Sequence, residues 1–214
     1  MRSILRWFRR SSVSALHAAL QRPAVRAKLA DPEAPETREI KDLMDAIDEA
    51  ELNLDAACAL MREAQVAYVP VVETDEFHIC LFLLAPHASI PLHDHPGMTV
   101  LSRVLRGSMR VTSYDRVSYG HVTRHEPVTI AAPARTVALF PHLRNIHEFV
   151  ALERGVAILD VIVPPYDDDR PCTYYDVYDD TPVSGKDANA VRRVVSVPEP
   201  DFSCVHVPYF GLPP

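Results

Sequence analysis

Cysteine is scarce in this chain of 214 residues, and the shortage excludes two kinds of small protein. The cysteines are too widely and irregularly spaced for a disulfide scaffold or a CxxC zinc site; they stand at Cys58, Cys80, Cys172 and Cys204. We therefore expect a reducing compartment, with the cytoplasm as the predicted location. Long hydrophobic runs are missing too. No stretch comes near the roughly 18 apolar residues of a membrane span, and no secretory hydrophobic segment is found, so we expect no membrane association.

Acidic residues are missing from the first 30 positions, which hold seven basic ones: Arg2, Arg6, Arg9, Arg10, Arg22, Arg26 and Lys28. Because the formal net charge of the chain is −7, the other 184 residues carry −14. The negative charge of these 184 residues, the acidic body of the chain, argues against nucleic acid as a partner. The basic start, with an apolar stretch among residues 4–8, has two interpretations. It is either a mitochondrial transit peptide or a short surface helix that folds onto the domain.

Proline is abundant instead, with 19 residues, and it disfavours helix interiors and central strands. Many short strands joined by rigid turns therefore fit better than a helical bundle. Strand-like segments lie between turn residues at 69–72, 77–84, 99–105, 109–114, 121–125, 128–130, 136–140, 148–152 and 157–163. Strands at this spacing predict a mainly β sandwich or barrel.

The remaining segments suggest three parts. Residues 1–37 are interpreted as the basic segment followed by a linker, because residues 31–38 contain two prolines and few apolar side chains. Residues 38–66 are interpreted as a helical region, a helix or broken helix pair packed outside the main domain, since apolar residues recur there at helical spacing. Residues 67–214 form the main domain. From Pro164 onward strand signals are few, which predicts a lid or a belt around the barrel.

One pair among the ten histidines stands out, in Ile90-Pro-Leu-His-Asp-His-Pro-Gly97. His93 and His95 are two positions apart, so on a strand both side chains point to the same face. Their imidazoles can then bind one metal ion, and neutral imidazole suits zinc, iron, copper and nickel. The Pro-Gly that follows ends the strand, as the mouth of a barrel requires. Asp94 points to the opposite face, where hydrogen bonding to nearby backbone is the simplest interpretation.

A third histidine has to come from a later strand, and Phe140-Pro-His-Leu-Arg-Asn-Ile-His147 offers two candidates. His147 opens a strand-like run and is preferred. His142 lies five residues earlier, where a regular strand would aim it at the other face, although a turn at Arg144 weakens that reasoning. His121 and His125 lie in a charged hairpin and are expected to face solvent.

The histidine pair and its surroundings resemble the first motif of the cupin superfamily, in which a glutamate and then a glycine follow the histidines. Gly107 matches the glycine, whereas Val100 stands in the position of the glutamate. Without that carboxylate the metal-binding face consists of histidines only. Three neutral histidines around a divalent ion leave a net positive charge and open coordination positions, which suits an anionic sulfur ligand and O2.

Further motifs, in order along the chain, resemble the thiol dioxygenase family that contains animal cysteamine (2-aminoethanethiol) dioxygenase and the plant cysteine oxidases. The first is Ile90–Met98, and Pro141–His147 is similar to the family's Pro-His-x-x-Asn-x-His. Ile158–Tyr166 is similar to its Leu-Asp-x-Leu-x-Pro-Pro-Tyr, and Cys172–Tyr175 to its Cys-x-Tyr-Tyr. The resemblance covers residues 68–214.

This resemblance implies a cupin-type double-stranded β-helix, a jelly-roll barrel, with Fe(II) held by His93, His95 and His147. It also implies that both atoms of O2 oxidise a thiol to a sulfinic acid. The thiols of the family are cysteamine and the N-terminal cysteine of peptides or proteins, whose oxidation can lead to oxygen-dependent degradation. The alternatives are another cupin metalloenzyme or a non-catalytic cupin that binds a ligand.

Four more residues take roles from the resemblance. Asp160 and Tyr166 match positions near the iron and are expected to support the ligands or position the substrate. Asp160 lies in an apolar strand-like run, where a buried carboxylate needs a partner. Cys172 and Tyr174 match a pair that forms a thioether crosslink in the animal member; a buried structural cysteine is the alternative.

Two departures from the family concern loops. The loop after Tyr166 is shorter than in the family and lacks its Gly-Arg, and the region around Gly120 lacks the long insertion of animal members. These differences bear on the substrate entrance and not on the metal site. The acidic body, without an obvious exposed apolar stripe, predicts a monomer.

Overall fold

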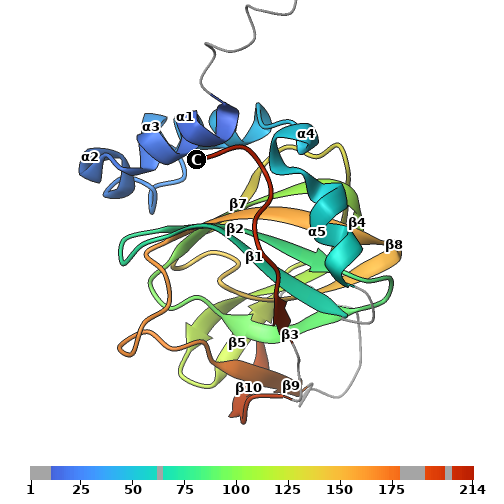
Figure 1. The fold of residues 1–214 in the computed structure, drawn as a ribbon. Helices are drawn as coiled ribbons and strands as arrows, with labels where there is room; N and C mark the ends of the chain where they lie inside the picture. The colour runs from blue at the N-terminus through green and yellow to red at the C-terminus, as the bar shows by residue number, and fades with distance from the viewer. Residues whose placement is uncertain (1–10, 62–64, 179–190, 201–203) are drawn as a thin grey trace, which may run out of the picture.

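The computed structural model describes residues 11–61, 65–178, 191–200 and 204–214, and Figure 1 shows a β-barrel with helices packed outside it. The helices come first in the chain: α1 (Ser12–Leu20), α2 (Pro23–Arg26), α3 (Pro35–Asp45), α4 (Glu49–Leu52) and α5 (Leu54–Met61). None of the described helices is long and apolar enough to cross a membrane. The strands follow: β1 (Val66–Glu73), β2 (His78–Leu84), β3 (Ser89–Asp94), β4 (Thr99–Ser118), β5 (His121–Arg124), β6 (Val128–Ala131), β7 (Val137–Leu139), β8 (Ile146–Val163), β9 (Tyr174–Tyr178), β10 (Val191–Val197) and β11 (Cys204–His206).

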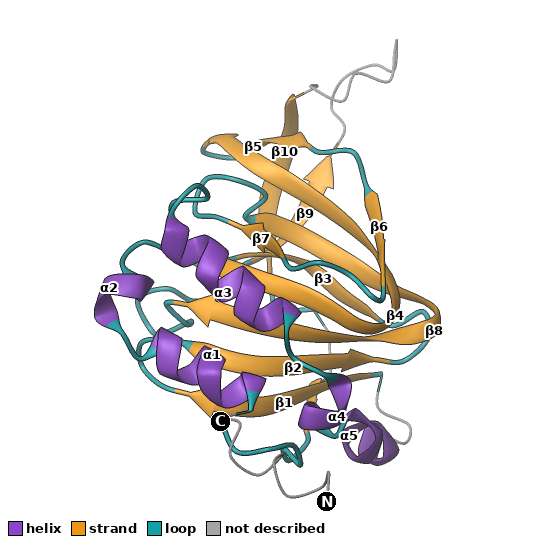
Figure 2. Ribbon diagram, turned by 90° about the horizontal axis from the view of Figure 1, so that it is seen from above, coloured by secondary structure: helices purple, strands orange, loops and turns teal. Residues whose placement is uncertain are grey.

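The barrel closes because β4 and β8 are long enough to pair with several neighbours each. Strand pairing runs β8-β3-β9-β10-β5-β4, and β4 pairs again with β8, which completes a ring. Strands β2 and β1 continue from the other side of β8, and β11 adds to the edge, parallel to β1. The mainly β barrel with helices outside it, as the sequence predicts, is confirmed (Figure 2).

Two glycines let the long strands pass close to each other where they bend. Gly107 in β4 and Gly155 in β8 both have positive φ, +72° and +70°. A Cβ on Gly107 would lie 2.0 Å from the carbonyl oxygen of Gly155, so only glycine fits there. The register of β4 with β8 shifts on both sides of Gly107. Segments predicted as separate strands on either side of each glycine are therefore continuous.

Helices α1 and α3 cover the outer face of the barrel (Figure 2). Leu16 and Leu20 of α1 and Ile40 of α3 are fully buried, in one core with Leu101 and Leu159 of the barrel. Burial of an aliphatic side chain contributes about 1.5–3 kcal/mol, so these helices are an integral part of the fold. The basic start thus forms a helix on the domain from residue 12 onward. Residues 1–10, on which the transit-peptide interpretation also depends, lie outside the described residues.

The linker expected at residues 31–38 needs correction, because α3 begins inside it at Pro35. Proline suits the first turn of a helix, where its missing N–H has no intrahelical partner. Thr37 is completely buried, and its hydroxyl donates to the carbonyl of Asp31 at 2.8 Å. The helical region that follows contains more breaks than expected. One of them is at Asn53, which ends α4 in a left-handed conformation with φ of 48°.

The region after Pro164 contains more strand structure than the sequence predicts. Strands β9 and β10 complete the barrel wall between β3 and β5, and β11 is a three-residue strand held by its pairing with β1. Such short pairings between distant segments leave little local signal in the sequence. The last residues run along the outside of the barrel to α4 (Figure 1), where the Leu212 N–H donates to the carbonyl of Glu51.

Candidate metal centre

Three histidines meet where β3 pairs with β8. His93 belongs to β3, His95 follows its last residue, and His147 is the second residue of β8. His93 and His147 face each other directly in the antiparallel register. One ring nitrogen of each histidine lies within 4.8 Å of the other two, and no other such group is found among the described residues. The Pro-Gly turn ends the strand as predicted, with Gly97 at φ of +67°.

Hydrogen bonds determine which nitrogen is protonated in two of the rings. His93 Nδ1 lies 2.8 Å from the carbonyl oxygen of Pro91, which can only accept, so Nδ1 carries the hydrogen. The Tyr166 hydroxyl donates to the carbonyl of Asp94 at 2.7 Å, and it therefore accepts from His95 Nδ1, also at 2.7 Å. Both histidines keep Nε2 free of hydrogen, with a lone pair available for a metal.

The spacing and charge of the rings fit a metal ion. His95 Nε2 and His147 Nε2 are 3.1 Å apart. Two nitrogens that are each about 2.1 Å from one ion, at tetrahedral or octahedral angles, lie about 3.0–3.4 Å apart. Burial lowers the pKa of all three histidines, and that of His95 is lowered further by the charges of the other two rings. The imidazoles are therefore neutral, which is the form that binds metals.

His142, the alternative third ligand, stays outside the cluster. Its side chain is exposed, and a turn with Arg144 at φ of +58° separates it from His147. Asn145 in the same turn holds the site together. Its side-chain amide donates to the carbonyl of His95 at 2.8 Å, and its oxygen accepts from the backbone N–H of the same residue. Sequence reasoning assigned Asn145 no role, although its place in the Pro-His-x-x-Asn-x-His motif was the available signal.

Val100, in the glutamate position of the cupin motif, is buried beside Met98, Leu139 and Ile162. No carboxylate joins the three histidines within the described part of the chain. The donor set is therefore three neutral nitrogens, and a divalent ion held by them would keep its full charge. Of the hairpin histidines, His121 is exposed as predicted. His125 is half-buried instead, and its Nε2 lies 2.9 Å from Oδ2 of Asp115.

A cavity of about 390 Å³ reaches His147 from the outside of the barrel. Its lining is mostly apolar, and the residues that contact it are Lys41, Ser102, Met109, Val111, Ser113, Val128, Ile130, Thr136, Val137, Ala138, Leu139, Arg144, His147, Phe149, Ile158 and Asp160. Most of these side chains come from β4, β6, β7 and β8. The cavity therefore offers space for a bound molecule next to the histidine cluster.

Asp160 lines this cavity on the same strand as His147. Its side chain is buried, and burial raises the pKa of its carboxyl to about 7, although a hydrogen bond with Ser102 lowers it in part. Among the described residues, Oδ1 of this carboxyl has no hydrogen-bond partner. Because a buried polar atom without a partner is costly, this oxygen is well placed to accept a hydrogen bond from a bound molecule.

Tyr166, Cys172 and Tyr174 gather beside the histidines. The Tyr166 ring stacks on His95 with 5.4 Å between ring centroids, and the Tyr174 ring lies 6.2 Å from that of His93. Burial raises the pKa of the Cys172 thiol, and the hydroxyls of Tyr166 and Tyr174 lower it in part. Burial also raises the pKa of Tyr174 to about 12. The structure thus places all three residues against the candidate ligands.

Asp94 connects β3, which carries His93, to the segment around β9. Its carboxylate accepts from the backbone N–H of Thr173 at 3.1 Å and from the hydroxyl of Tyr175 at 2.7 Å. The bond to the Thr173 backbone agrees with the expected bonding to backbone, whereas the Tyr175 bond is an addition; the partners are 79 and 81 residues away in the sequence. The contact helps to hold Tyr174, which lies between these two partners, opposite His93.

One protein-family model matches the part of the chain that forms the barrel. The PCO_ADO family model matches residues 37–213, a span that contains the three histidines, Asp160, Tyr166, Cys172 and Tyr174. The chain belongs to this family. The match starts within α3, so part of the helical cover belongs to the family pattern as well.

Curated relatives carry the names of thiol-oxidising enzymes. A human protein named 2-aminoethanethiol dioxygenase is 31% identical over 84% of this chain and 84% of its own length. A Dictyostelium discoideum protein named probable 2-aminoethanethiol dioxygenase is 33% identical over 65% of each chain. Plant cysteine oxidase 2 of Arabidopsis thaliana is 42% identical, over 53% of this chain and 45% of its own length. The chain thus spans less than two thirds of the last two relatives.

Solved structures with a similar barrel include a cupin superfamily protein from Desulfitobacterium hafniense. It has a TM-score of 0.37 and 17% identity, over 48% of this chain and 80% of that chain. The predicted membership in the thiol dioxygenase family is confirmed by the family match and by the human relative.

Proposed function

We propose that this protein is an Fe(II)-dependent thiol dioxygenase, which uses O2 to oxidise a thiol to a sulfinic acid. The substrate is cysteamine, the N-terminal cysteine of a peptide or protein, or both. The observation that carries the proposal is the cluster of His93, His95 and His147, two of whose rings are held with Nε2 unprotonated. Family membership supports the same reaction.

The choice of iron rests on the donor set. Three neutral imidazoles without a carboxylate suit a divalent transition metal with open coordination positions. Iron(II) bound there would supply electrons to O2 and would favour the thiolate form of a substrate thiol. The Pro91 carbonyl and the Tyr166 hydroxyl keep His93 and His95 in the tautomers that can bind it.

We assign to Asp160 the role of orienting the substrate. Cysteamine and an N-terminal cysteine share a primary ammonium group two carbons from the thiol. Asp160 lines the cavity that also reaches His147, and its Oδ1 has no hydrogen-bond partner among the described residues, so we assign it to accept a hydrogen bond from that ammonium. A charge-assisted hydrogen bond of this kind contributes about 1.5–3 kcal/mol. It would select aminothiols over thiols that lack the amine.

We propose that Cys172 and Tyr174 form the thioether crosslink that the family resemblance implies. The Tyr174 hydroxyl affects the pKa of the Cys172 thiol, and the thioether would join Sγ to the ring carbon next to that hydroxyl. Formation of this thioether removes two hydrogen atoms, which O2 accepts as the oxidant. Intact-mass measurement after turnover should then show a loss of the mass of two hydrogens, and Cys172→Ser should abolish that loss. An unchanged mass after many turnovers would leave Cys172 as a structural cysteine.

The reaction itself is tested on protein purified without O2 and loaded with Fe(II). We expect O2 uptake with cysteamine or with a peptide that starts with cysteine, and a product heavier by two oxygen atoms. Propanethiol, which lacks the ammonium, serves as the control substrate and should react much more slowly. If neither aminothiol supports O2 uptake at full iron occupancy, the proposed function is wrong.

We also propose that the enzyme works as a monomer in a reducing compartment such as the cytoplasm. All four cysteines of the chain are free thiols, which agrees with a reducing compartment. Light scattering at micromolar concentration tests the oligomeric state, and a mass near twice that of the chain would contradict the monomer.

A further inference from the structure

We infer that the outer part of the cavity is a binding subsite for the residues that follow an N-terminal cysteine, and that it selects an apolar side chain followed by an acidic one. This inference rests on the proposed function, because it places the cysteine thiol at the histidines. It concerns the mouth of the cavity, by which we mean its exposed lining residues Arg144, Val128 and Val137 together with the half-buried Lys41, and the buried apolar side chains that line the rest.

The first observation is the size of the cavity. Its volume is about 390 Å³, within the range of about 300–1,000 Å³ that is typical of pockets for drug-sized ligands. Cysteamine has only four non-hydrogen atoms, and the groups that would hold it, His147 and Asp160, take up one part of the lining. The remaining space suits a longer ligand that starts with the same aminothiol unit.

The second observation is the character of the wall. The cavity is lined by apolar side chains such as Met109, Ile130 and Phe149, which belong to a buried or half-buried apolar cluster. Val128 and Val137 at the outside are 38% and 43% exposed. An apolar side chain of a bound peptide would cover this wall, with a gain of about 25 cal/mol for each Å² removed from water.

The third observation is the charge at the mouth. Lys41 and Arg144 both line the cavity, and neither side chain forms an ion pair with another described residue. Lys41 Nζ lies 5.8 Å from the ring centroid of Phe140, while the Arg144 side chain is exposed. Lys41 and Arg144 make the mouth complementary to a carboxylate.

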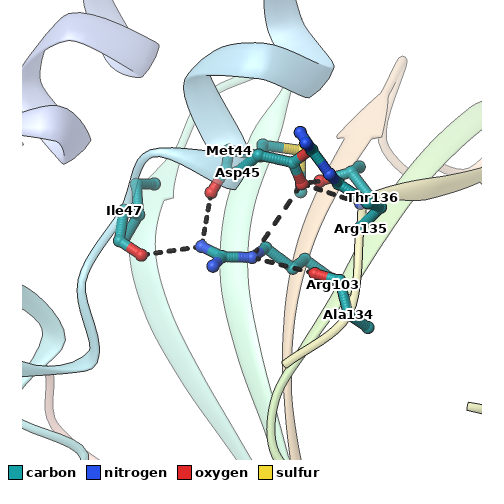
Figure 3. Close-up of polar contacts among 7 residues, drawn as sticks. All are labelled: Met44, Asp45, Ile47, Arg103, Ala134, Arg135 and Thr136. Atoms are coloured by element: carbon teal, nitrogen blue, oxygen red, sulfur yellow. Dashed lines mark hydrogen bonds and ion pairs between the residues drawn. The ribbon is translucent and has the colours of Figure 1, made fainter. Parts of the chain in front are cut away.

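The helix that carries Lys41 is fixed to the barrel by a polar network (Figure 3). The Arg103 guanidinium of β4 donates to the carbonyls of Met44 and Ile47 at the end of α3, both at 2.7 Å. Asp45 accepts from the backbone N–H of Thr136 at 2.8 Å and from its hydroxyl at 2.7 Å. Because Thr136 is itself a lining residue, the network fixes α3 and one side of the mouth relative to each other.

The kinetic test compares cysteamine with three tetrapeptides, Cys-Leu-Glu-Gly, Cys-Leu-Lys-Gly and Cys-Gly-Gly-Gly. We expect the highest kcat/KM for the peptide with leucine and glutamate, about five-fold above the lysine peptide. The difference should shrink as salt is raised, because the charges at the mouth are partly exposed. Equal kcat/KM for the three peptides would overturn the inference.

Variants locate the effect. Lys41→Glu should reverse the preference between the glutamate and lysine peptides and leave the rate with cysteamine unchanged. Arg144→Asn should weaken the preference, and asparagine is chosen because it tolerates the positive φ of this position. Arg110→Gln is the matched control, since Arg110 is exposed on β4 and outside the cavity lining. An equal change of preference in the control would also overturn the inference.

A binding measurement gives an independent readout. Peptides with serine in place of cysteine cannot be oxidised, and a dye at the C-terminus reports their binding by fluorescence anisotropy. Ser-Leu-Glu-Gly should bind more tightly than Ser-Leu-Lys-Gly to the wild type, and the order should reverse in Lys41→Glu. If cysteamine is oxidised but these peptides bind alike, the inference fails and the proposed function stands. If no thiol is oxidised but the peptide order holds, the proposed function fails alone.

Discussion

At its inner end the cavity is bounded by regular strands, whereas its mouth is formed by a helix, a turn and two short strands. The inner end holds His147 and Asp160 on one long strand, β8, with His93 directly opposite on β3. The mouth takes Lys41 from α3 and Arg144 from a turn with positive φ. At the inner end Asp160 is buried and His147 is half-buried, while Lys41 and Arg144 at the mouth form no ion pair with another described residue.

The difference separates the chemistry of the site from its selectivity. Strand register places the histidines, because neighbouring positions on paired strands have a fixed spacing. The mouth depends on how a helix packs against the barrel, which the Asp45 and Arg103 contacts secure. Changes at the inner end should therefore affect short and long aminothiols alike, and changes at the mouth should affect long substrates selectively.

Removal of His147 should have the largest effect. His147→Ala takes away one of three nitrogen donors, so the protein should lose bound iron and lose activity with all thiols by more than about 100-fold. His142→Ala is the matched control, because His142 is exposed outside the cluster. Metal analysis of both desalted variants checks the prediction. Loss of iron only in His142→Ala would reassign the third ligand.

Tyr166→Phe should weaken the inner end without removing a ligand. The variant loses the hydroxyl that accepts from His95 Nδ1, so the ring is free to rotate or to change its tautomer. The expected loss is about ten- to hundred-fold in metal affinity or activity. Titration with Fe(II) separates the two, and Tyr119→Phe is the matched control, because Tyr119 is 98% exposed and lies outside the site. An affinity equal to that of the wild type would contradict the role of Tyr166.

Asp160→Asn should lower kcat/KM for cysteamine by about ten-fold, because an amide oxygen is a weaker acceptor for an ammonium than a carboxylate. The loss should be small with propanethiol. Both substrates losing the same factor would show that Asp160 acts on the metal ligands instead of on the ammonium.

The same carboxyl predicts a pH dependence of stability in metal-free protein. Its folded-state pKa of about 7 lies above the ordinary value of 3.8, so between about pH 4 and pH 7 only the folded state keeps the proton. The free energy of unfolding therefore falls as pH rises through this window, by up to about 4 kcal/mol from this group. Asp160→Asn should be more stable than the wild type at pH 8 and nearly equal to it at pH 4. Urea unfolding at both values checks this.

Asp45→Ala should change kcat/KM less than the other variants do, and only for long substrates. It removes the acceptor for both Thr136 hydrogen bonds, at a cost of about 1–3 kcal/mol in stability. The mouth should loosen, with a few-fold loss of kcat/KM for Cys-Leu-Glu-Gly and none for cysteamine. Equal losses for both substrates would mean that the two ends of the cavity are not independent.

Local pattern was enough to predict the inner end. His93 and His95 are two residues apart and are followed by Pro-Gly. The two-residue period of a strand was enough to place both side chains on one face. The preference for His147 over His142 followed from a strand-like run that the structure contains as β8. Motifs that lie close together in the sequence thus carried most of the site.

Other features had no local signal. The Asp94 contacts reach residues 79 and 81 positions away, and α3 starts inside a segment whose prolines suggested a linker. Strands β9 and β11 pair with β3 and β1 across long stretches of sequence. These pairings depend on which surfaces meet once the barrel closes, and single-residue preferences do not encode that.

The sequence by itself determined the family, the mainly β barrel and the three candidate histidines that the structure brings together, because each rests on short motifs or on strand periodicity. The tertiary structure alone decided three further points: that the rings of His93 and His95 are held by Pro91 and Tyr166, that Asp160 lines a cavity and has an oxygen without a partner among the described residues, and that Lys41 lines the same cavity. All three depend on distances between segments far apart in the chain, which packing fixes and local preference does not.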